Sequence, residues 1–154
     1  MIQLNTHRRT LRGGFTAIEM LIVVAVIGIM AAAVMPRISR IVAEERVRKL
    51  QGAVAVDLEL AFALANRERK PVTVTYNAST RTLNITDRAS GTVLKSRYLG
   101  QSQTFSTTGV AFTPSGGITI FPAGLATAAC TVTVANGGFR RRVAVTRAGL
   151  VTKS

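Results

Sequence analysis

The side chains that most often carry out catalysis are scarce in this 154-residue sequence. It contains one histidine, His7, and one cysteine, Cys130, which lie far apart in the chain. Most of the acidic residues fall on one predicted amphipathic helix beside basic residues, the pattern of a solvated helix face; these are Glu44, Glu45, Asp57, Glu59 and Glu68. Spacings typical of metal ligands, such as Cys-x-x-Cys or a histidine pair, are absent. The sequence therefore predicts no catalytic residue, no metal site and no cofactor.

Glu19 is the one charged side chain in a long apolar stretch. Phe15 to Met35 is 21 residues with this single charge, and a helix of that length spans roughly 31 Å, the hydrocarbon thickness of a bilayer. An unpaired carboxylate in hydrocarbon costs a few kcal/mol, so Glu19 requires a partner. Gly13 and Gly14 form an open site for a protease, and a cut after Gly14 creates an amine on Phe15 within one helical turn of Glu19.

The basic leader, Gly14, the run Phe15-Thr16-Ala17-Ile18-Glu19 and the unbroken apolar helix resemble the class III signal of type IV pilins and type II secretion pseudopilins. The resemblance implies that a prepilin peptidase cleaves between Gly14 and Phe15 and methylates the new Phe15 amine. It also implies that Glu19 pairs with the Phe15 amine of an adjacent subunit in a helical filament. The implied partners are the peptidase, other major and minor pilins or pseudopilins, and inner-membrane lipid.

Two other readings of the N-terminal segment stay open, a secretory signal and a simple membrane anchor on a basic β domain. The run Ala31-Ala32-Ala33 imitates an Ala-x-Ala cleavage site, although the cut predicted at Gly14 precedes the apolar core instead of following it. The charges of His7-Arg8-Arg9 and Arg12 favour a cytoplasmic N-terminus. The pilin reading then places the chain in the bacterial inner membrane as a single-pass protein with a periplasmic C-terminal domain, and later in a filament.

The helix is predicted to continue beyond the apolar run for about 50 residues in all. Gly28 and Pro36 are expected to give it flexibility, and pilin-like helices often carry such residues where they unwind on packing into the filament. After Pro36, apolar residues recur every three or four positions until charges and Pro71 end the helix. The predicted divisions are a leader at 1–14, a membrane-spanning and filament-core helix at 15–36, an amphipathic helix at 37–70 and a β domain at 71–154.

From Val72 onward the apolar period becomes two, which predicts strands. We expect a hairpin of Val72–Tyr76 and Arg81–Thr86, followed by strands at Thr92–Leu99, Gln103–Thr107, Val110–Thr113, Ile118–Phe121, Cys130–Ala135, Arg140–Thr146 and Leu150–Thr152. Cys130 lies in one of these alternating runs and is predicted to be a small core residue, with no second cysteine for a disulfide. The predicted fold is α+β and pilin-like: a long N-terminal helix, membrane-spanning in its first half, packed on an antiparallel β-sheet domain.

Three later segments narrow the resemblance within the pilin superfamily. The stretch Val110–Gly116, the strand at Cys130–Val134 and the closing hairpin at Arg140–Gly149 are similar to the GspH/FimT group of minor pilins and pseudopilins. This resemblance implies a structural subunit that helps to initiate or cap a type IV pilus or a type II secretion pseudopilus. The same leader and helix serve both systems, so both remain as predictions.

The net charge is +13, and every acidic residue lies at or before Asp87, so the basic residues beyond Asp87 have no carboxylate in the same part of the sequence. Some FimT-like minor pilins are associated with DNA uptake through a Gly-Arg-x-Arg motif, but here the corresponding turn reads Gly149-Leu150-Val151-Thr152-Lys153. A possible DNA or anion site is therefore assigned to other basic residues, namely Arg140, Arg141, Arg142, Arg147 and Lys153. In a strand, Arg140 and Arg142 share one face, and Arg141 and Arg147 share the other. The alternatives are a solvated basic edge strand and a face that meets acidic subunits or lipid headgroups.

Overall fold

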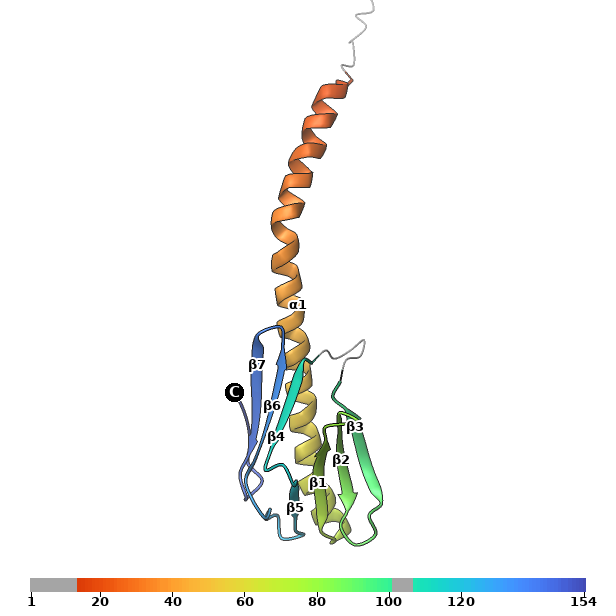
Figure 1. Ribbon diagram of the computed structural model, residues 1–154, viewed down its shortest axis with the longest axis vertical. Helices are drawn as coiled ribbons and strands as arrows, with labels where there is room; N and C mark the ends of the chain where they lie inside the picture. The colour runs from red at the N-terminus through yellow and green to blue at the C-terminus, as the bar shows by residue number, and fades with distance from the viewer. Residues whose placement is uncertain (1–13, 101–106) are drawn as a thin grey trace, which may run out of the picture. The chain divides into compact units, whose positions relative to one another are not determined.

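The structure is a computed structural model, and it describes residues 14–100 and 107–154. Figure 1 shows the chain as a long helix followed by short strands. The helix is α1 (Ala17–Glu68), and the strands are β1 (Val72–Asn77), β2 (Thr82–Asp87), β3 (Val93–Tyr98), β4 (Gly109–Thr113), β5 (Ile118–Ile120), β6 (Cys130–Asn136), β7 (Phe139–Val145) and β8 (Val151–Lys153). The strand expected at Gln103–Thr107 falls outside the described residues except for Thr107, which is not in a strand.

The predicted single helix of about 50 residues is confirmed, with 52 residues in α1. It begins two residues after Phe15, because Thr16 caps it, and it ends before Arg69, whose φ of 52° is a left-handed conformation that a helix cannot continue. The contacts divide the chain into two units, 1–38 and 39–154. In the first unit the described helical residues are all exposed, and α1 is long and apolar enough to cross a membrane.

The strands form two antiparallel sheets, which together with the C-terminal half of α1 make up the second unit (Figure 1). One sheet has the order β3-β2-β1-β5, and the other has the order β4-β6-β7-β8. Neighbours in sequence pair as hairpins, such as β1 with β2 and β6 with β7. The predicted α+β fold, a long helix packed on antiparallel β structure, is confirmed, and the division into two sheets is added by the structure.

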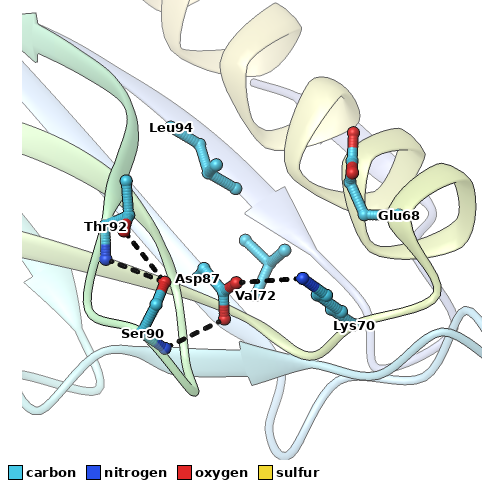
Figure 2. A pocket seen from close by; sticks show the side chains of 7 residues that line it. All are labelled: Glu68, Lys70, Val72, Asp87, Ser90, Thr92 and Leu94. Carbon is cyan, nitrogen blue, oxygen red and sulfur yellow. Dashed lines mark hydrogen bonds and ion pairs between the residues drawn. The ribbon is translucent and has the colours of Figure 1, made fainter.

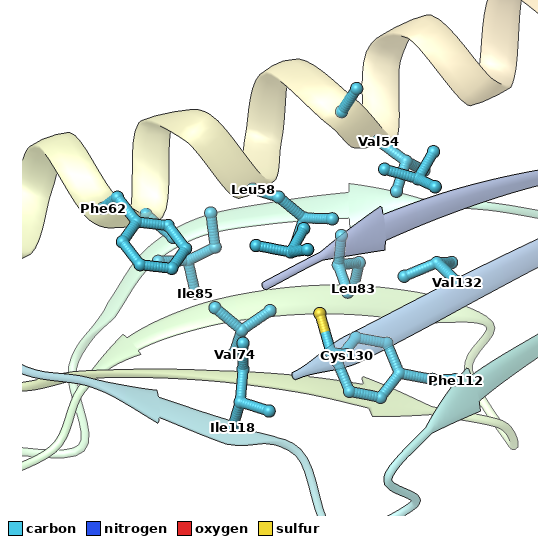
Figure 3. Packing of buried hydrophobic residues seen from close by; sticks show 14 of the residues in the cluster. Val54, Leu58, Phe62, Val74, Leu83, Ile85, Phe112, Ile118, Cys130 and Val132 are labelled. Atoms are coloured by element: carbon cyan, nitrogen blue, oxygen red, sulfur yellow. The ribbon is translucent and has the colours of Figure 1, made fainter. Parts of the chain in front are cut away.

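The core lies between α1 and the inner faces of both sheets, as Figure 3 shows. The helix contributes buried residues at intervals of three and four, and the strands contribute alternate residues. Each spacing places the apolar residues of an element on one of its faces, and that face is buried. The fully buried positions include Leu50, Val54, Leu58, Val74, Leu83, Ile118 and Val132. Cys130 is buried among them as predicted, and this burial raises the pKa of its thiol to about 11.

The prediction of a solvated face is wrong for Asp57, whose exposed fraction is 1%. Its Oδ1 lies 3.1 Å from Nζ of Lys95, and its carboxylate accepts hydrogen bonds from both Nε and Nη2 of Arg97. Both cations come from β3, at the edge of the first sheet. Steps of three and four link Asp57 to the buried Val54 and Ala61. Its partners cannot be read from helical spacing, because they lie about 40 residues away in the chain.

Gln51 joins the helix to the C-terminal end of the second sheet. Its Nε2 donates to the carbonyl of Arg142 at 2.8 Å and to the carbonyl of Ser154 at 3.0 Å. Arg142 and Ser154 also exchange two backbone hydrogen bonds, so the residue that follows β8 is held to β7. One buried amide therefore ties α1 to β7 and to the residue that follows β8.

Replacing Gln51 with methionine is expected to lower the free energy of unfolding by about 1–3 kcal/mol, because two carbonyls lose their shared donor with little change in side-chain volume. The measurement is denaturant unfolding of the full chain in mild detergent, followed by circular dichroism. Asn66→Met, at an exposed position of the same helix, is the matched control and should change the stability by less than about 0.5 kcal/mol. Equal values for the two variants would contradict this role of Gln51.

Candidate functional site

Thr16 and Glu19 close the N-terminal end of α1 in a reciprocal arrangement. One carboxylate oxygen of Glu19 accepts hydrogen bonds from the Thr16 amide at 2.8 Å and from the Thr16 hydroxyl at 2.9 Å. In return the Glu19 amide donates to the Thr16 hydroxyl at 3.3 Å. This is a capping box, in which a threonine N-cap and a glutamate three residues later satisfy each other's backbone groups. The spacing Thr-x-x-Glu is visible in the sequence, but its capping role was not predicted.

Only one of the two carboxylate oxygens of Glu19 accepts hydrogen bonds in the capping box. Both bonds go to Oε2, and no residue in the described part of the chain donates to Oε1. Around it lies an apolar hollow of about 440 Å³, lined by Phe15, Glu19, Met20, Ile22 and Val23. When such a segment lies in hydrocarbon or against other apolar helices, a carboxylate oxygen is a strong acceptor for a cation, because little water then competes with it. Between Phe15 and Met35, Glu19 is therefore the one charged side chain on an exposed, apolar stretch of helix.

The predicted cleavage site lies in chain without regular structure. Gly14, Phe15 and Thr16 precede the helix and are all exposed, with an exposed fraction of 79% for the Phe15 side chain. A protease requires such an extended and accessible segment. The helix is continuous through Gly28 and Pro36, and unwinding of this segment in a filament stays a prediction.

The structure does not bring the five predicted basic residues together. Arg141 points toward the helix, where its Nη2 lies 2.9 Å from Oε1 of Glu44. Arg147 lies beyond β7, which ends at Val145, and its Nε donates to the carbonyl of Ala126 at 3.4 Å. The prediction that Arg147 shares a strand face with Arg141 is therefore wrong, because the strand is shorter than the sequence indicated.

Arg140 and Arg142 share the outward face of β7, as predicted, since both are exposed and alternate with residues that face the helix. Lys153 pairs with Val143, which is buried on the inner face, so Lys153 does not join the two arginines. No carboxylate in the described residues lies within ion-pair distance of either arginine. Arg140 and Arg142 are therefore the two predicted basic residues that share a face and have no ion-pair partner among the described residues.

A shallow hollow of about 410 Å³ lies beside these arginines on the outward face of the second sheet. Its floor consists of small side chains in register across β4 and β6, where Gly109 faces Ala135 and Ala111 faces Thr133. The next pairings place Ala135 beside Arg140 and Thr133 beside Arg142. We name this hollow the arginine trough. The sequence does not predict its floor, because small residues on two separate strands carry no local signal.

A second, more polar hollow of about 280 Å³ lies where α1 ends, and Figure 2 shows its lining. Asp87 accepts hydrogen bonds from the amides of Ala89 and Ser90, and the bond from Ala89 is the main cause that lowers the pKa of the carboxyl group. Lys70 approaches the same carboxylate at 4.0 Å. These interactions fix the turn between β2 and β3. Within residues 14–100 and 107–154, no three ligand-type side chains are grouped to hold a metal ion.

The sequence matches no protein-family model and no curated protein. Solved structures do resemble the chain. The type IV minor pilin FimU of Pseudomonas aeruginosa is 15% identical with a TM-score of 0.59, over 71% of this chain and 89% of FimU. In a second crystal form the values are 16% and 0.55, over 70% and 91%. The minor pseudopilin EpsH from the type 2 secretion system of Vibrio cholerae is 13% identical with a TM-score of 0.50, over 71% and 96%.

These likenesses establish the fold. The chain has the pilin-like α+β fold of a type IV minor pilin and of a minor pseudopilin, with a long N-terminal apolar helix and antiparallel β-sheets packed on its C-terminal half.

Proposed function

We propose that this chain is a minor pilin or pseudopilin of the GspH/FimT type, a structural subunit that helps to initiate or cap a type IV pilus or a type II secretion pseudopilus. The observation that carries the proposal is Glu19, a carboxylate with one open oxygen on an otherwise apolar and fully exposed helical segment. An exposed surface of this kind is stable only in a membrane or against other subunits.

The proposal includes two maturation steps, cleavage and methylation, at the N-terminal end of the same segment. A prepilin peptidase cuts the accessible bond between Gly14 and Phe15 and methylates the Phe15 amine. The chain sits once across the bacterial inner membrane, with the N-terminus cytoplasmic and the β domain periplasmic. Oε1 of Glu19 then accepts the charged amine of Phe15 from a neighbouring subunit, while Oε2 stays on Thr16. In hydrocarbon this pairing neutralises two charges at once, which makes it both strong and selective.

The capping box also explains how Glu19 enters the membrane before it meets a neighbour. Two hydrogen bonds from Thr16 reduce the cost of burying the carboxylate in an unassembled subunit. Assembly then adds the amine to the open oxygen without breaking these bonds. The role is structural, and the proposal includes no catalytic step.

The proposal is tested by isolating filaments sheared or extracted from the host, and by measuring the share of the chain that purifies with them. We expect copurification of the mature chain, and loss or reduction of filaments when the chain is deleted. A chain that stays entirely in the membrane fraction, with filaments unchanged on its deletion, would contradict the filament role and would favour a singly anchored β domain.

The arginine trough supports a second candidate function, binding of DNA outside the inner membrane. Arg140 and Arg142 are exposed and without an ion-pair partner among the described residues, and the small floor beside them leaves room for a phosphate backbone. Arginine suits this role because its planar group binds phosphate oxygens in pairs. Acidic subunits and lipid headgroups are the competing occupants.

If the trough binds duplex DNA, Arg140→Gln together with Arg142→Gln should reduce the slope of log affinity against log salt by about two units. Each arginine then accounts for roughly one phosphate contact. Arg88→Gln is the matched control, because it removes the same charge from an exposed turn between β2 and β3. An unchanged slope in the double variant, or an equal loss in Arg88→Gln, would exclude the trough as the DNA site.

A further inference from the structure

Two turns in the second unit share a sequence ending and a set of hydrogen bonds. Phe121–Leu125 and Thr146–Leu150 both end in Ala-Gly-Leu. In each turn the amide of the first residue donates to the carbonyl of the last, at 2.8 Å in the first turn and 3.0 Å in the second, and the glycine amide donates to the first carbonyl at 3.0 Å. Gly124 and Gly149 both have a positive φ, 76° and 83°, which residues with a side chain rarely adopt. We name these two segments the twin turns.

The twin turns lie next to each other, and each exposes the leucine that ends it. The amide of Ala126, directly after the first turn, donates to the carbonyl of Arg147 in the second turn at 2.8 Å. Leu125 and Leu150 have exposed fractions of 54% and 66%. Turn residues in contact with water are mostly small or polar. Two exposed leucines on neighbouring turns therefore indicate a contact with an apolar partner.

The other exposed apolar residues of the β structure gather at the same end of the second unit. Val72, at the start of β1, pairs with Asp87 at the end of β2 and with Ile120 at the end of β5. Ile120 also pairs with Ala126, beside the twin turns. Among residues 69–100 and 107–154, the large apolar side chains exposed at this end are Val93, Leu94, Phe121, Leu125 and Leu150, whereas Tyr98 lies at the opposite end. Helix α1 also finishes here (Figure 1), and we name this end the apolar end.

The apolar end carries positive charge that its own carboxylates do not balance. Glu68 is paired with Arg67 at 2.8 Å, and Asp87 lies 4.0 Å from Lys70. Three further arginines follow α1, follow β2 and lie in the second twin turn; they are exposed and have no ion-pair partner among the described residues, namely Arg69, Arg88 and Arg147. No acidic residue occurs after Asp87 in the sequence. These cations can therefore bind anions outside the chain.

Exposed leucines surrounded by unpaired arginines fit a partner that is negatively charged at its surface and apolar beneath. An anionic bilayer has this order, with phosphate groups above hydrocarbon. Arginine suits its interface, because the guanidinium binds phosphate oxygens while the stem lies along apolar surface. Nucleic acid supplies the phosphates but no hydrocarbon for the leucines. A protein partner needs a closely packed, complementary surface, whereas the leucines here stand on separate turns.

We propose that the apolar end binds an anionic lipid surface, with Leu125 and Leu150 of the twin turns inserted below the headgroups and with Arg69, Arg88 and Arg147 against the lipid phosphates. The contact goes beyond the proposed function, because it is made by the second unit and requires neither the segment 15–35 nor a filament. A few apolar side chains and a few cations give a shallow, reversible contact, far weaker than that of a spanning helix.

A single tryptophan reports insertion directly, because the chain contains none. The full chain carrying Leu150→Trp is held in nanodiscs of phosphatidylcholine, which cover its apolar segment, and is mixed with vesicles of phosphatidylcholine and brominated phosphatidylglycerol in equal parts. The tryptophan emission should shift to shorter wavelength and be quenched by the bromine. Vesicles of brominated phosphatidylcholine alone should cause neither change. Ser79→Trp is the matched control, in an exposed turn at the opposite end, and should respond to neither kind of vesicle.

Flotation of the same nanodiscs with the anionic vesicles measures the affinity. Leu125→Ser with Leu150→Ser should weaken binding at least about tenfold, because two apolar side chains no longer leave water. Val56→Ser, at an exposed position of α1, is its control and should bind like the parent chain.

The arginines are tested in the same assay. Arg69→Gln with Arg88→Gln should also weaken binding about tenfold or more, since each cation near an anionic surface contributes separately. Arg46→Gln with Lys49→Gln removes the same charge from exposed positions of α1 and should leave binding unchanged. Added salt should weaken binding of the parent chain.

Several results would overturn the proposal. Loss of binding in the arginine variant but not in the leucine variant would mean adsorption by charge alone, and an equal loss in the α1 control would mean that net charge decides. A loss confined to Arg140→Gln with Arg142→Gln would place the lipid contact in the arginine trough. Absence of binding to anionic vesicles, or a loss of duplex DNA binding instead of vesicle binding in the twin-turn variants, also contradicts it. Filament incorporation is measured separately, so the proposed function stands or fails on its own result.

Discussion

Replacing Glu19 with alanine is expected to leave the chain in the membrane and to lower its incorporation into filaments about 100-fold. The substitution makes the segment more apolar, so membrane insertion is retained. The Phe15 amine of the neighbouring subunit, however, lies in hydrocarbon without a counter-ion. Loss of one partner of a buried ion pair costs about 3–5 kcal/mol, which corresponds to a factor of 100 or more. The measurement is the ratio of filament-bound to membrane-bound chain.

Two variants show whether the charge or the helix cap is responsible. Thr16→Val removes the capping hydroxyl but keeps the carboxylate, and loss of a helix cap costs about 0.5–2 kcal/mol. It should therefore reduce incorporation much less than Glu19→Ala. Glu68→Ala removes a carboxylate from the other end of α1 and should have no effect. Normal incorporation of Glu19→Ala would mean that the carboxylate does not hold subunits together.

Replacing Asp57 with alanine is expected to destabilise the β domain by about 3–5 kcal/mol, the largest stability effect that we predict. Asp57 is buried against Lys95 and Arg97, whose own side chains are only partly exposed. Its removal leaves two cations in a poorly solvated site. The hydrogen bond to Asp57 raises the pKa of Arg97 in the parent chain. Without Asp57 the guanidinium still keeps its charge, because arginine is not deprotonated in proteins, so Arg97 cannot relieve the repulsion by losing a proton. Denaturant unfolding of the full chain in detergent measures the loss.

A charge-free replacement separates the cost of an orphaned charge from the cost of lost packing. Asp57→Leu combined with Lys95→Met and Arg97→Met removes all three charges while keeping similar volumes. Its stability should be close to that of the parent chain, because buried ion networks often stabilise little relative to apolar residues. Glu59→Ala, two residues along on the exposed side, is the control and should cost less than about 0.5 kcal/mol. A similar cost for Asp57→Ala and Glu59→Ala would contradict the buried network.

The parts of the fold that the sequence predicted well are those with a local period. The switch from steps of three and four to alternation locates the end of α1 and most of the strands, because burial of one face imposes these periods. Strand ends depend on tertiary contacts. The sequence predicts a strand at Arg140–Thr146 with Arg147 on the same face as Arg141, whereas β7 ends at Val145 and Arg147 donates to the carbonyl of Ala126.

The features that the sequence did not predict depend on residues far apart in the chain. Asp57 lies at the spacing of the buried face of α1, but its partners Lys95 and Arg97 come from β3, and no local pattern shows them. The arginine trough requires three strands in register, and its floor residues are too small to form a pattern. At the N-terminal end the signal is contiguous, so Gly14, Phe15 and Glu19 could be proposed from the sequence alone.

The intact mass and N-terminal sequence of the chain, purified from host membranes with the prepilin peptidase present or deleted, test the central claim most directly. With the peptidase, the account predicts a chain that begins at Phe15 with a methylated amine; without it, the leader through Gly14 should remain. A chain cut after the run Ala31-Ala32-Ala33, or one that still begins at Met1 when the peptidase is present, would contradict the assignment as a filament subunit.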